Sequence, residues 1–215
     1  MKNVKMINWS KNFAYAIGLL TTDGSLSKDG RHIDFTSKDK IQVKNFMSCL
    51  EIKNKIGKKY SGAGRLSWRI QFGNTVLYKF LLNIGLRPNK SKILGKILIP
   101  DKYLFDFLRG HFDGDGTFYS YWDPRWRSSF MFYLEFTSAS KRHIHWLRKR
   151  ISDTIRVNGH ITKTSKKDYY QLKYAKSETL KILPKIYYDK KNIFLLRKYL
   201  KIRKVLGIIG KENLI

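Results

Sequence analysis

Two aspartates in matched surroundings are the residues of this chain whose type and spacing most clearly suggest chemistry. Asp23 stands in the stretch AIGLLTTDGSL, Asp115 stands in LRGHFDGDGTF, and a glycine follows each of them. Carboxylate oxygens are the ligands that Mg²⁺ prefers in proteins, so two such aspartates side by side would suit hard cations. Each aspartate could instead belong to an ordinary Asp-Gly turn at a helix end, but the matched pair argues against that interpretation.

The two stretches are part of a longer internal repeat, with an offset of 115 − 23 = 92 residues. Downstream, residues 33–50 and 134–151 both carry a Phe-Thr-Ser run, and residues 66–81 resemble residues 169–183. Three matched blocks in the same order are hard to attribute to chance. The chain is therefore predicted to consist of two related halves.

The elements that position the aspartates can be predicted from periodicity. Apolar residues at helical spacing precede each Asp-Gly pair, over residues 9–20 and 101–112. Residues 65–72 alternate between polar and apolar types, which predicts a strand with one polar, basic face and one apolar face. Each half is predicted to be helix, hairpin, helix, hairpin, helix, so the fold class is α+β with two αββαββα repeats. Further helices are expected at residues 40–50, 74–84, 141–155, 177–187 and 193–206.

The predicted domains are residues 1–98 and 99–215, with a linker at about residues 86–98. Each sheet has an apolar face that helices would cover, which leaves a polar, basic face open. Two such sheets side by side would form a concave saddle in which a duplex could lie.

Composition points to a polyanionic partner. Lys and Arg number 44 against 16 Asp and Glu, which gives a net charge of +28, while aromatics at 14% exclude a disordered basic tail. Nucleic acid is the natural partner; a ribosomal or merely basic soluble protein and an anionic membrane surface are the alternatives. The single cysteine, Cys49, excludes an internal disulfide framework. No apolar run is long enough to span a membrane, so an intracellular protein is expected, in the prokaryotic cytoplasm or an organelle such as the mitochondrion or chloroplast.

The two motifs and the order of elements resemble those of LAGLIDADG homing endonucleases over almost the whole chain. The resemblance implies a single-chain, pseudo-symmetric fold whose motif helices pack at the interface, where Gly18 and Gly110 allow close approach. It also implies a monomer, often intron-encoded, that cuts both strands of a long asymmetric DNA target and leaves 3′ overhangs. Mg²⁺ is the implied cofactor, and Mn²⁺ or Ca²⁺ can occupy the same sites.

The resemblance assigns Asp23 and Asp115 as metal ligands and catalytic residues. It also implies a lysine near each scissile phosphate. In the first half Lys90 is preferred, with Lys92 as its rival. In the second half Lys191 is preferred over Lys190, and plain phosphate binding is the alternative role for all four lysines.

The sequence departs from the family pattern at two motif positions. The earlier aspartate of the motif is Thr21 in the first copy and Asp113 in the second, so Asp113 is not predicted to be a ligand. His111 replaces an apolar residue of the second motif and is expected to be a packed residue at the interface.

Other polar residues are predicted to lie on the open sheet faces. Asp34 and Glu135 are candidates for residues that orient the metal site or its water without binding the metal directly. The alternatives are that each pairs with a neighbouring Lys or Arg, or contacts cytosine. The predicted DNA-binding residues are Arg65, Ser67, Arg69, Gln71, Tyr119, Arg125, Arg127, Tyr169, Gln171 and Lys173. The stretch around Arg125 and Arg127 is predicted to reach the flank of the target, unless Trp126 turns inward to close the core.

Two alternative functions remain open at this stage. The first is an intron RNA maturase or a DNA-binding regulator on the same fold, without cleavage. The second is an unrelated basic RNA-binding protein, which would not explain the repeat. Cleavage in Mg²⁺ separates the first from an endonuclease, and a preference for duplex DNA separates the second.

Overall fold

The computed structural model describes residues 7–164 and 168–215. Within these ranges it contains seven α-helices and two four-stranded antiparallel sheets, which confirms the α+β class and the twofold repeat. The first half runs α1 (Lys11–Asp23), β1 (Gly24–Leu26), β2 (His32–Ser37), α2 (Lys40–Leu50), β3 (Gly57–Tyr60), β4 (Leu66–Gly73) and α3 (Thr75–Ile84). The second half runs α4 (Leu104–Asp115), β5 (Thr117–Trp122), β6 (Phe130–Ser138), α5 (Lys141–Ile155), β7 (His160–Lys163), β8 (Tyr170–Tyr174), α6 (Lys176–Ile186) and α7 (Leu196–Ile208).

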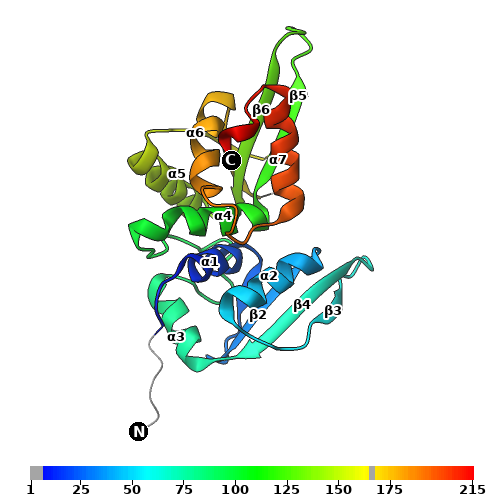
Figure 1. The fold of residues 1–215 in the computed structure, drawn as a ribbon. Helices are drawn as coiled ribbons and strands as arrows, with labels where there is room; N and C mark the ends of the chain where they lie inside the picture. The colour runs from blue at the N-terminus through cyan, green and yellow to red at the C-terminus, as the bar shows by residue number, and fades with distance from the viewer. Residues whose placement is uncertain (1–6, 165–167) are drawn as a thin grey trace.

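The two halves have the same topology. Their sheets have the orders β1-β2-β4-β3 and β5-β6-β8-β7. In the first half α2 and α3 pack against the sheet, and in the second half α5 and α6 do so. Figure 1 shows the two halves as separate lobes, with α1 and α4 between them. In the described part of the first half, the chain passes from α3 into the linker, whereas in the second half α6 is followed by the further helix α7.

Local sequence signals fix where several helices begin. The side chains of Ser10, Asp39, Asn74 and Ser140 each accept a hydrogen bond from a backbone N–H in the first turn of α1, α2, α3 and α5. These residue types are strongly preferred at this position because they satisfy amide groups that have no partner within the helix. The predicted bounds of α2 and α5, residues 40–50 and 141–155, agree with the structure at both ends.

The interface between the halves is formed by direct backbone packing of α1 against α4. A Cβ atom added to Gly18 would overlap the carbonyl oxygen of Phe107, and one added to Gly110 would overlap that of Tyr15. Only glycine permits this approach. The two motif helices are therefore held with their backbones in direct contact at these glycines.

The linker between α3 and α4 is irregular but packed. Leu86, Leu94 and Ile97 along it are buried, and so is the side chain of Lys90. A short 3-10 turn, η1 (Asp101–Tyr103), leads from the linker into α4. The linker is thus part of the core, which matters for the site because Lys90 lies on it.

The β5–β6 hairpin projects beyond its helices, as Figure 1 shows. Its tip carries Trp126, whose exposed fraction is 68%, so this indole does not close the core. Arg125 in the same tip makes an ion pair with Asp123 at 3.0 Å. In the part of the chain that the structure describes, no helix is long and apolar enough to cross a membrane.

Candidate functional site

The two predicted aspartates occupy equivalent places at the ends of the interface helices. Asp23 is the last residue of α1 and Asp115 is the last residue of α4. A Cβ atom on Gly114 would lie 3.1 Å from an oxygen of the Asp23 side chain, which locates that carboxylate against the end of α4. The two carboxylates therefore converge where the two helix C-termini meet.

The electrostatics of this convergence disfavour two ionised carboxylates. Burial raises the pKa of the Asp23 carboxyl to about 7, and the negative charge of Asp115 contributes to the same shift. Asp115 keeps contact with solvent, and the loss of hydration around its carboxyl still raises its pKa. Helix C-termini carry partial negative charge, which adds to the repulsion. A cation at this point would relieve all of these costs.

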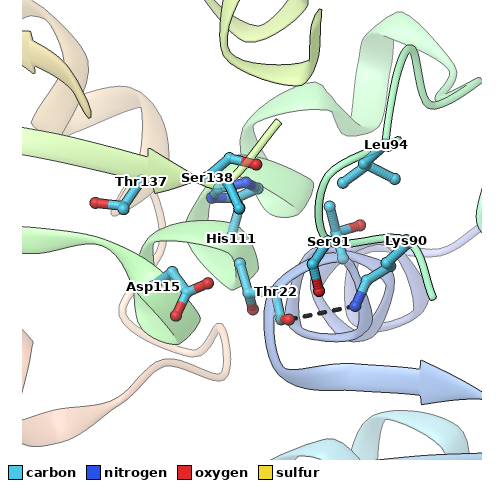
Figure 2. Close-up of a pocket in the computed structure, with 10 residues that line it drawn as sticks. Thr22, Lys90, Ser91, Leu94, His111, Asp115, Thr137 and Ser138 are labelled. Atoms are coloured by element: carbon cyan, nitrogen blue, oxygen red, sulfur yellow. Dashed lines mark hydrogen bonds between the residues drawn. The ribbon is translucent and has the colours of Figure 1, made fainter. Parts of the chain in front are cut away.

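Lys90 supplies one cation to the site from the linker. Its ammonium group donates hydrogen bonds to the backbone carbonyls of Thr22, at 3.3 Å, and Gly24. Figure 2 shows Lys90 and Ser91 of the linker beside Thr22 at the end of α1. Burial lowers the pKa of Lys90 to about 8, while Asp115 and Asp23 oppose that shift. Lys90 therefore remains largely charged at neutral pH and satisfies carbonyl groups that the helix end leaves free.

Lys198 occupies the equivalent place in the second half, and the sequence analysis missed it. Burial lowers its pKa to about 8, as for Lys90. Lys90 contacts the carbonyls of residues 22 and 24, and Lys198 contacts those of residues 114 and 116. These positions are related by the offset of the repeat, since 22 + 92 = 114 and 24 + 92 = 116. Its ammonium group donates to the carbonyls of Phe112 at 2.5 Å, Gly114 at 3.2 Å and Gly116 at 2.7 Å.

The other predicted lysines lie elsewhere. Lys191 is exposed in the loop before α7, and its backbone N–H donates to the Asp189 carboxylate at 2.9 Å. Its neighbour Lys190 is exposed in the same loop. Lys92 forms a surface ion pair with Asp168 at 2.9 Å. Lys198, rather than Lys191, therefore matches Lys90 in position.

Two small polar recesses flank the helix ends. One, of 130 Å³, is lined by Asp115 and His111 of α4 together with Thr22 and Lys90 (Figure 2). The other, of 210 Å³, is lined by Asp23, Thr22 and Lys90 together with Arg87 and Asn89 of the linker. Each recess thus combines a carboxylate with the Lys90 ammonium group.

The residues at the helix ends fit a hard divalent cation. Among the described residues no group of three or more His, Cys, Asp and Glu side chains could hold a metal ion. Mg²⁺ can bind through one or two carboxylates, with water and substrate phosphate at its remaining positions. Asp23 and Asp115 are the residues that would hold such an ion.

Asp34 and Glu135 occupy equivalent places on the two open sheet faces, and both have protein partners. Asp34 forms an ion pair with Arg69 across β2 and β4. Glu135 accepts a hydrogen bond from Gln171 at 2.6 Å and lies 3.8 Å from the ammonium group of Lys173. The pairing with neighbouring side chains that the sequence left open is therefore what the structure contains. A role for Asp34 and Glu135 in supporting the predicted metal ligands stays a prediction.

The remaining predicted DNA-binding residues lie where strand alternation puts them. Ser67 and Gln71 share a face of β4 with Arg69, because Ile70 and Phe72 point into the core. The ring of Tyr119 stacks on Tyr133 at 5.2 Å between centroids. Arg65 is exposed just before β4, Arg127 is exposed in the β5–β6 tip, and Tyr169 precedes β8. None of these positions contradicts a role in DNA contact.

Asp113 and His111 are packing residues. Asp113 is fully buried and accepts hydrogen bonds from the Tyr15 hydroxyl at 2.7 Å and the Leu195 N–H at 2.8 Å. These bonds tie α4 to α1 and to the start of α7. His111 is buried beside His143, with their Nε2 atoms 3.2 Å apart. Thr21, at the position that matches Asp113, donates its hydroxyl to the Ile17 carbonyl at 2.7 Å.

A buried ion pair that sequence analysis missed holds the loop before α7. Arg109 donates to the carboxylate of Asp106 at 2.9 Å and to the carbonyls of Ile186 at 3.1 Å and Ile193 at 2.9 Å. The guanidinium group has no exposed surface, so its charge depends on these acceptors. The i, i+3 spacing of Asp106 and Arg109 on a predicted helix was the available signal.

Comparison with known proteins supports the same fold. No family model matches the sequence, and the search of curated proteins found no match. Among solved structures, the homing endonuclease I-WcaI bound to its DNA recognition sequence has a TM-score of 0.62 and 14% identity, covering 94% of this chain and 94% of that chain. I-DmoI in complex with DNA and Ca has a TM-score of 0.58 and 15% identity, covering 89% of this chain and 97% of that chain.

A second kind of protein shares the architecture. Full-length DUF199/WhiA from Thermatoga maritima has a TM-score of 0.56 and 16% identity, covering 96% of this chain and 70% of that chain. Its N-terminal part is described as a LAGLIDADG domain. The chain therefore has the two-motif LAGLIDADG fold, as its motifs predicted. Identities this low establish the fold and leave activity to be argued from the site.

The raised pKa of Asp23 makes a prediction about stability. The unfolded chain loses this proton near pH 3.8 and the folded chain near pH 7, so in that window the folded state binds more protons and stability falls as pH rises. Asp23→Asn removes this loss. Without metal, we expect the variant to exceed the wild type by about 1–2 kcal/mol at pH 8, after allowance for solvent and for the two lysines, and to approach it at pH 4.

Urea unfolding of both proteins at pH 4, 6 and 8 in EDTA measures this difference. If the difference in free energy of unfolding between the two proteins stays constant or shrinks as pH rises, the negative charge of ionised Asp23 is already stabilised by other groups of the protein without a metal ion.

Proposed function

We propose that this protein is a sequence-specific, metal-dependent endonuclease that cuts both strands of duplex DNA. One observation carries the proposal: two aspartates converge at the C-termini of two packed helices, and each helix end binds a lysine. A protein that only binds polyphosphate has no use for paired acids amid a charge of +28. The similarity in fold to endonucleases that have been solved with DNA supports duplex DNA as the substrate.

The proposed mechanism divides the work between the helix ends and the sheets. Asp23 and Asp115 would hold divalent cations, which when bound would activate water and stabilise the leaving oxygen. Lys90 and Lys198, charged at neutral pH, would offset the negative charge that develops on each scissile phosphate. The open sheet faces would contact the bases, with Arg69 suited to guanine.

The target is proposed to be long and asymmetric, because the two sheet faces differ. Arg69 and Gln71 in the first half stand where the second half has Gln171 and Lys173. The protein is further proposed to act as a monomer, to leave 3′ overhangs and to use Mg²⁺, with Mn²⁺ and Ca²⁺ able to bind at the same place. An intron as its coding context is part of the same proposal.

Incubation with a randomised duplex library in Mg²⁺, followed by sequencing of the new ends, tests the proposal. Ends that depend on Mg²⁺, share one long motif and have a fixed stagger are expected, and an EDTA reaction is the control. Tight duplex or RNA binding without enriched ends would favour the regulator or maturase alternative, with structured RNA as the next substrate.

Substitution of Lys198 is expected to lower the cleavage rate far more than substitution of Lys191. Lys198→Met removes the charge beside Asp115 at similar side-chain length, and we expect one strand to be cut about 100-fold more slowly. Lys191→Met is expected to change either rate by less than about twofold, because the side chain is exposed in a loop. Strand-resolved single-turnover cleavage measures both. A larger effect at Lys191 would return the catalytic role to that residue.

A further inference from the structure

The linker that carries Lys90 is anchored to the second half of the protein. At the start of α5, the Ser140 hydroxyl donates a hydrogen bond to the Leu94 carbonyl at 2.5 Å. The Nδ1 atom of His143, one turn later, lies 2.8 Å from the Gly95 carbonyl. Both donors are buried, and both acceptors belong to the linker backbone.

The contact between His143 and the linker fixes the tautomers of two histidines. A carbonyl only accepts, so the hydrogen of the neutral His143 ring is on Nδ1 and its Nε2 is an acceptor. His111 of α4 must then donate from its own Nε2 across the 3.2 Å contact. Burial lowers the pKa of both rings, which keeps them neutral. The hydrogen bonds therefore run in one direction, from α4 through α5 to the linker.

The anchored linker in turn positions Lys90. The backbone N–H groups of Ile93 and Leu94 donate to the Lys90 carbonyl at 3.0 Å and 2.8 Å, forming a tight turn. From this turn the Lys90 side chain reaches the carbonyls at the end of α1. The second site has no such dependence, because Lys198 lies on helix α7. The matching motif residue of His111 in α1 is Leu19, which cannot form the same bond.

We propose that His143 is a positioning residue that holds the Lys90 turn beside Asp23 through its bond to Gly95. The consequence for cutting rests on the proposed endonuclease function: cleavage of the strand served by Asp23 and Lys90 depends on His143, and cleavage of the other strand does not. A second consequence is independent of that function: His143 keeps the Lys90 amine buried at the end of α1 and so protects it from chemical modification.

Two amide variants separate the Gly95 bond from the bulk of the ring. His143→Asn places an N–H donor where Nδ1 stood, whereas His143→Gln places it where Nε2 stood and leaves Gly95 without a partner. Both variants lose the imidazole, so a purely structural role predicts similar defects in the two. His145→Gln on the same helix is the matched control, because that side chain is exposed.

The first readout is the cutting rate of each strand in a single-turnover reaction on a doubly end-labelled target. The strand slowed by Lys90→Met identifies the Lys90 site. We expect His143→Gln to slow that strand by about 10- to 100-fold, since small misplacements of a charged group have effects of this size, and the other strand by less than about threefold. His143→Asn is expected to restore most of the loss. Equal slowing of both strands, or equal defects in Asn and Gln, overturns the proposal.

The second readout does not depend on cleavage. Reductive methylation followed by mass spectrometry measures how fast the Lys90 amine reacts. It is expected to be protected in the wild type, His143→Asn and His145→Gln, and to react at least about tenfold faster in His143→Gln. Unchanged protection in His143→Gln overturns the positioning role. A wild type that fails to cut while this pattern holds would contradict the endonuclease function alone.

A third variant covers the case in which both His143 variants fail to fold. His111→Leu removes the donor that orients the His143 ring and introduces the residue found at the matching place in α1. We expect at least about threefold slowing of the Lys90 strand and faster methylation of Lys90. If the cutting rate of this strand and the methylation rate of Lys90 both stay unchanged in His111→Leu, the proposal is overturned.

Discussion

Asp23→Asn and Asp115→Asn are each expected to abolish double-strand cleavage while leaving DNA binding intact. The substitution keeps the shape of the side chain and removes the negative charge that a divalent cation needs. Because the two carboxylates converge at the helix ends, loss of either one is expected to lower the cleavage rate by at least about 10³-fold, or about 4 kcal/mol of activation free energy.

DNA binding is expected to be retained because the negatively charged aspartates repel the DNA phosphates. Removing one negative charge beside the phosphates should leave the dissociation constant within about threefold or tighten it. Asp153→Asn is the matched control, since that aspartate is exposed on α5 and its ion pair is with Lys149 on the same helix, at 3.1 Å. Cleavage rates on labelled target and gel-shift titrations at one fixed salt concentration measure the two effects.

The opposite outcome would be equally informative. Retained cutting of both strands in Asp23→Asn would remove that residue from the mechanism and leave Asp115 with Lys90 and Lys198. A loss of binding that parallels the loss of cleavage would mean that the aspartates organise the fold. The stability measurement in EDTA separates this case, because Asp23→Asn is expected to stabilise the metal-free protein at pH 8.

The internal repeat is the reason that so much of the site could be predicted from the sequence. Asp23 alone is one of many Asp-Gly pairs that end a helix, but its match to Asp115 in a series of matched blocks makes shared geometry the simplest explanation. The same repeat predicted the two sheets, and strand alternation placed Arg69 on the polar face with Ile70 and Phe72 beneath it.

The parts that were missed depend on contacts that the repeat does not encode. Lys198 matches Lys90 in space, but Lys90 comes from an irregular linker and Lys198 from a helix, so no alignment of the halves pairs them. The structure reveals that the two lysines are equivalent, because the backbone carbonyls that accept their hydrogen bonds are related by the 92-residue offset. The pairing of Asp34 with Arg69 likewise needs the register of β2 against β4, which periodicity cannot supply.

Gly18→Ala is expected to destabilise the protein by more than about 3 kcal/mol, although alanine usually stabilises a helix. In an isolated helix the change from glycine to alanine gains about 1 kcal/mol, so the expected sign is reversed by packing alone. A methyl group on Gly18 would overlap the Phe107 carbonyl, which is backbone and cannot move aside without separating α1 from α4. Overpacking against a flexible side chain costs about 1–3 kcal/mol, and a rigid neighbour raises that cost.

Urea unfolding of Gly18→Ala, Gly110→Ala and the control Gly62→Ala tests the interface. Gly62 lies in the β3–β4 turn with open space around it, so its variant is expected to stay within about 0.5 kcal/mol of the wild type. Any protein that survives the interface substitutions should also cut poorly, because spreading the helices separates Asp23 from Asp115. A stable, fully active Gly18→Ala variant would mean that the two helices tolerate a wider separation, and that the aspartates do not depend on their close approach.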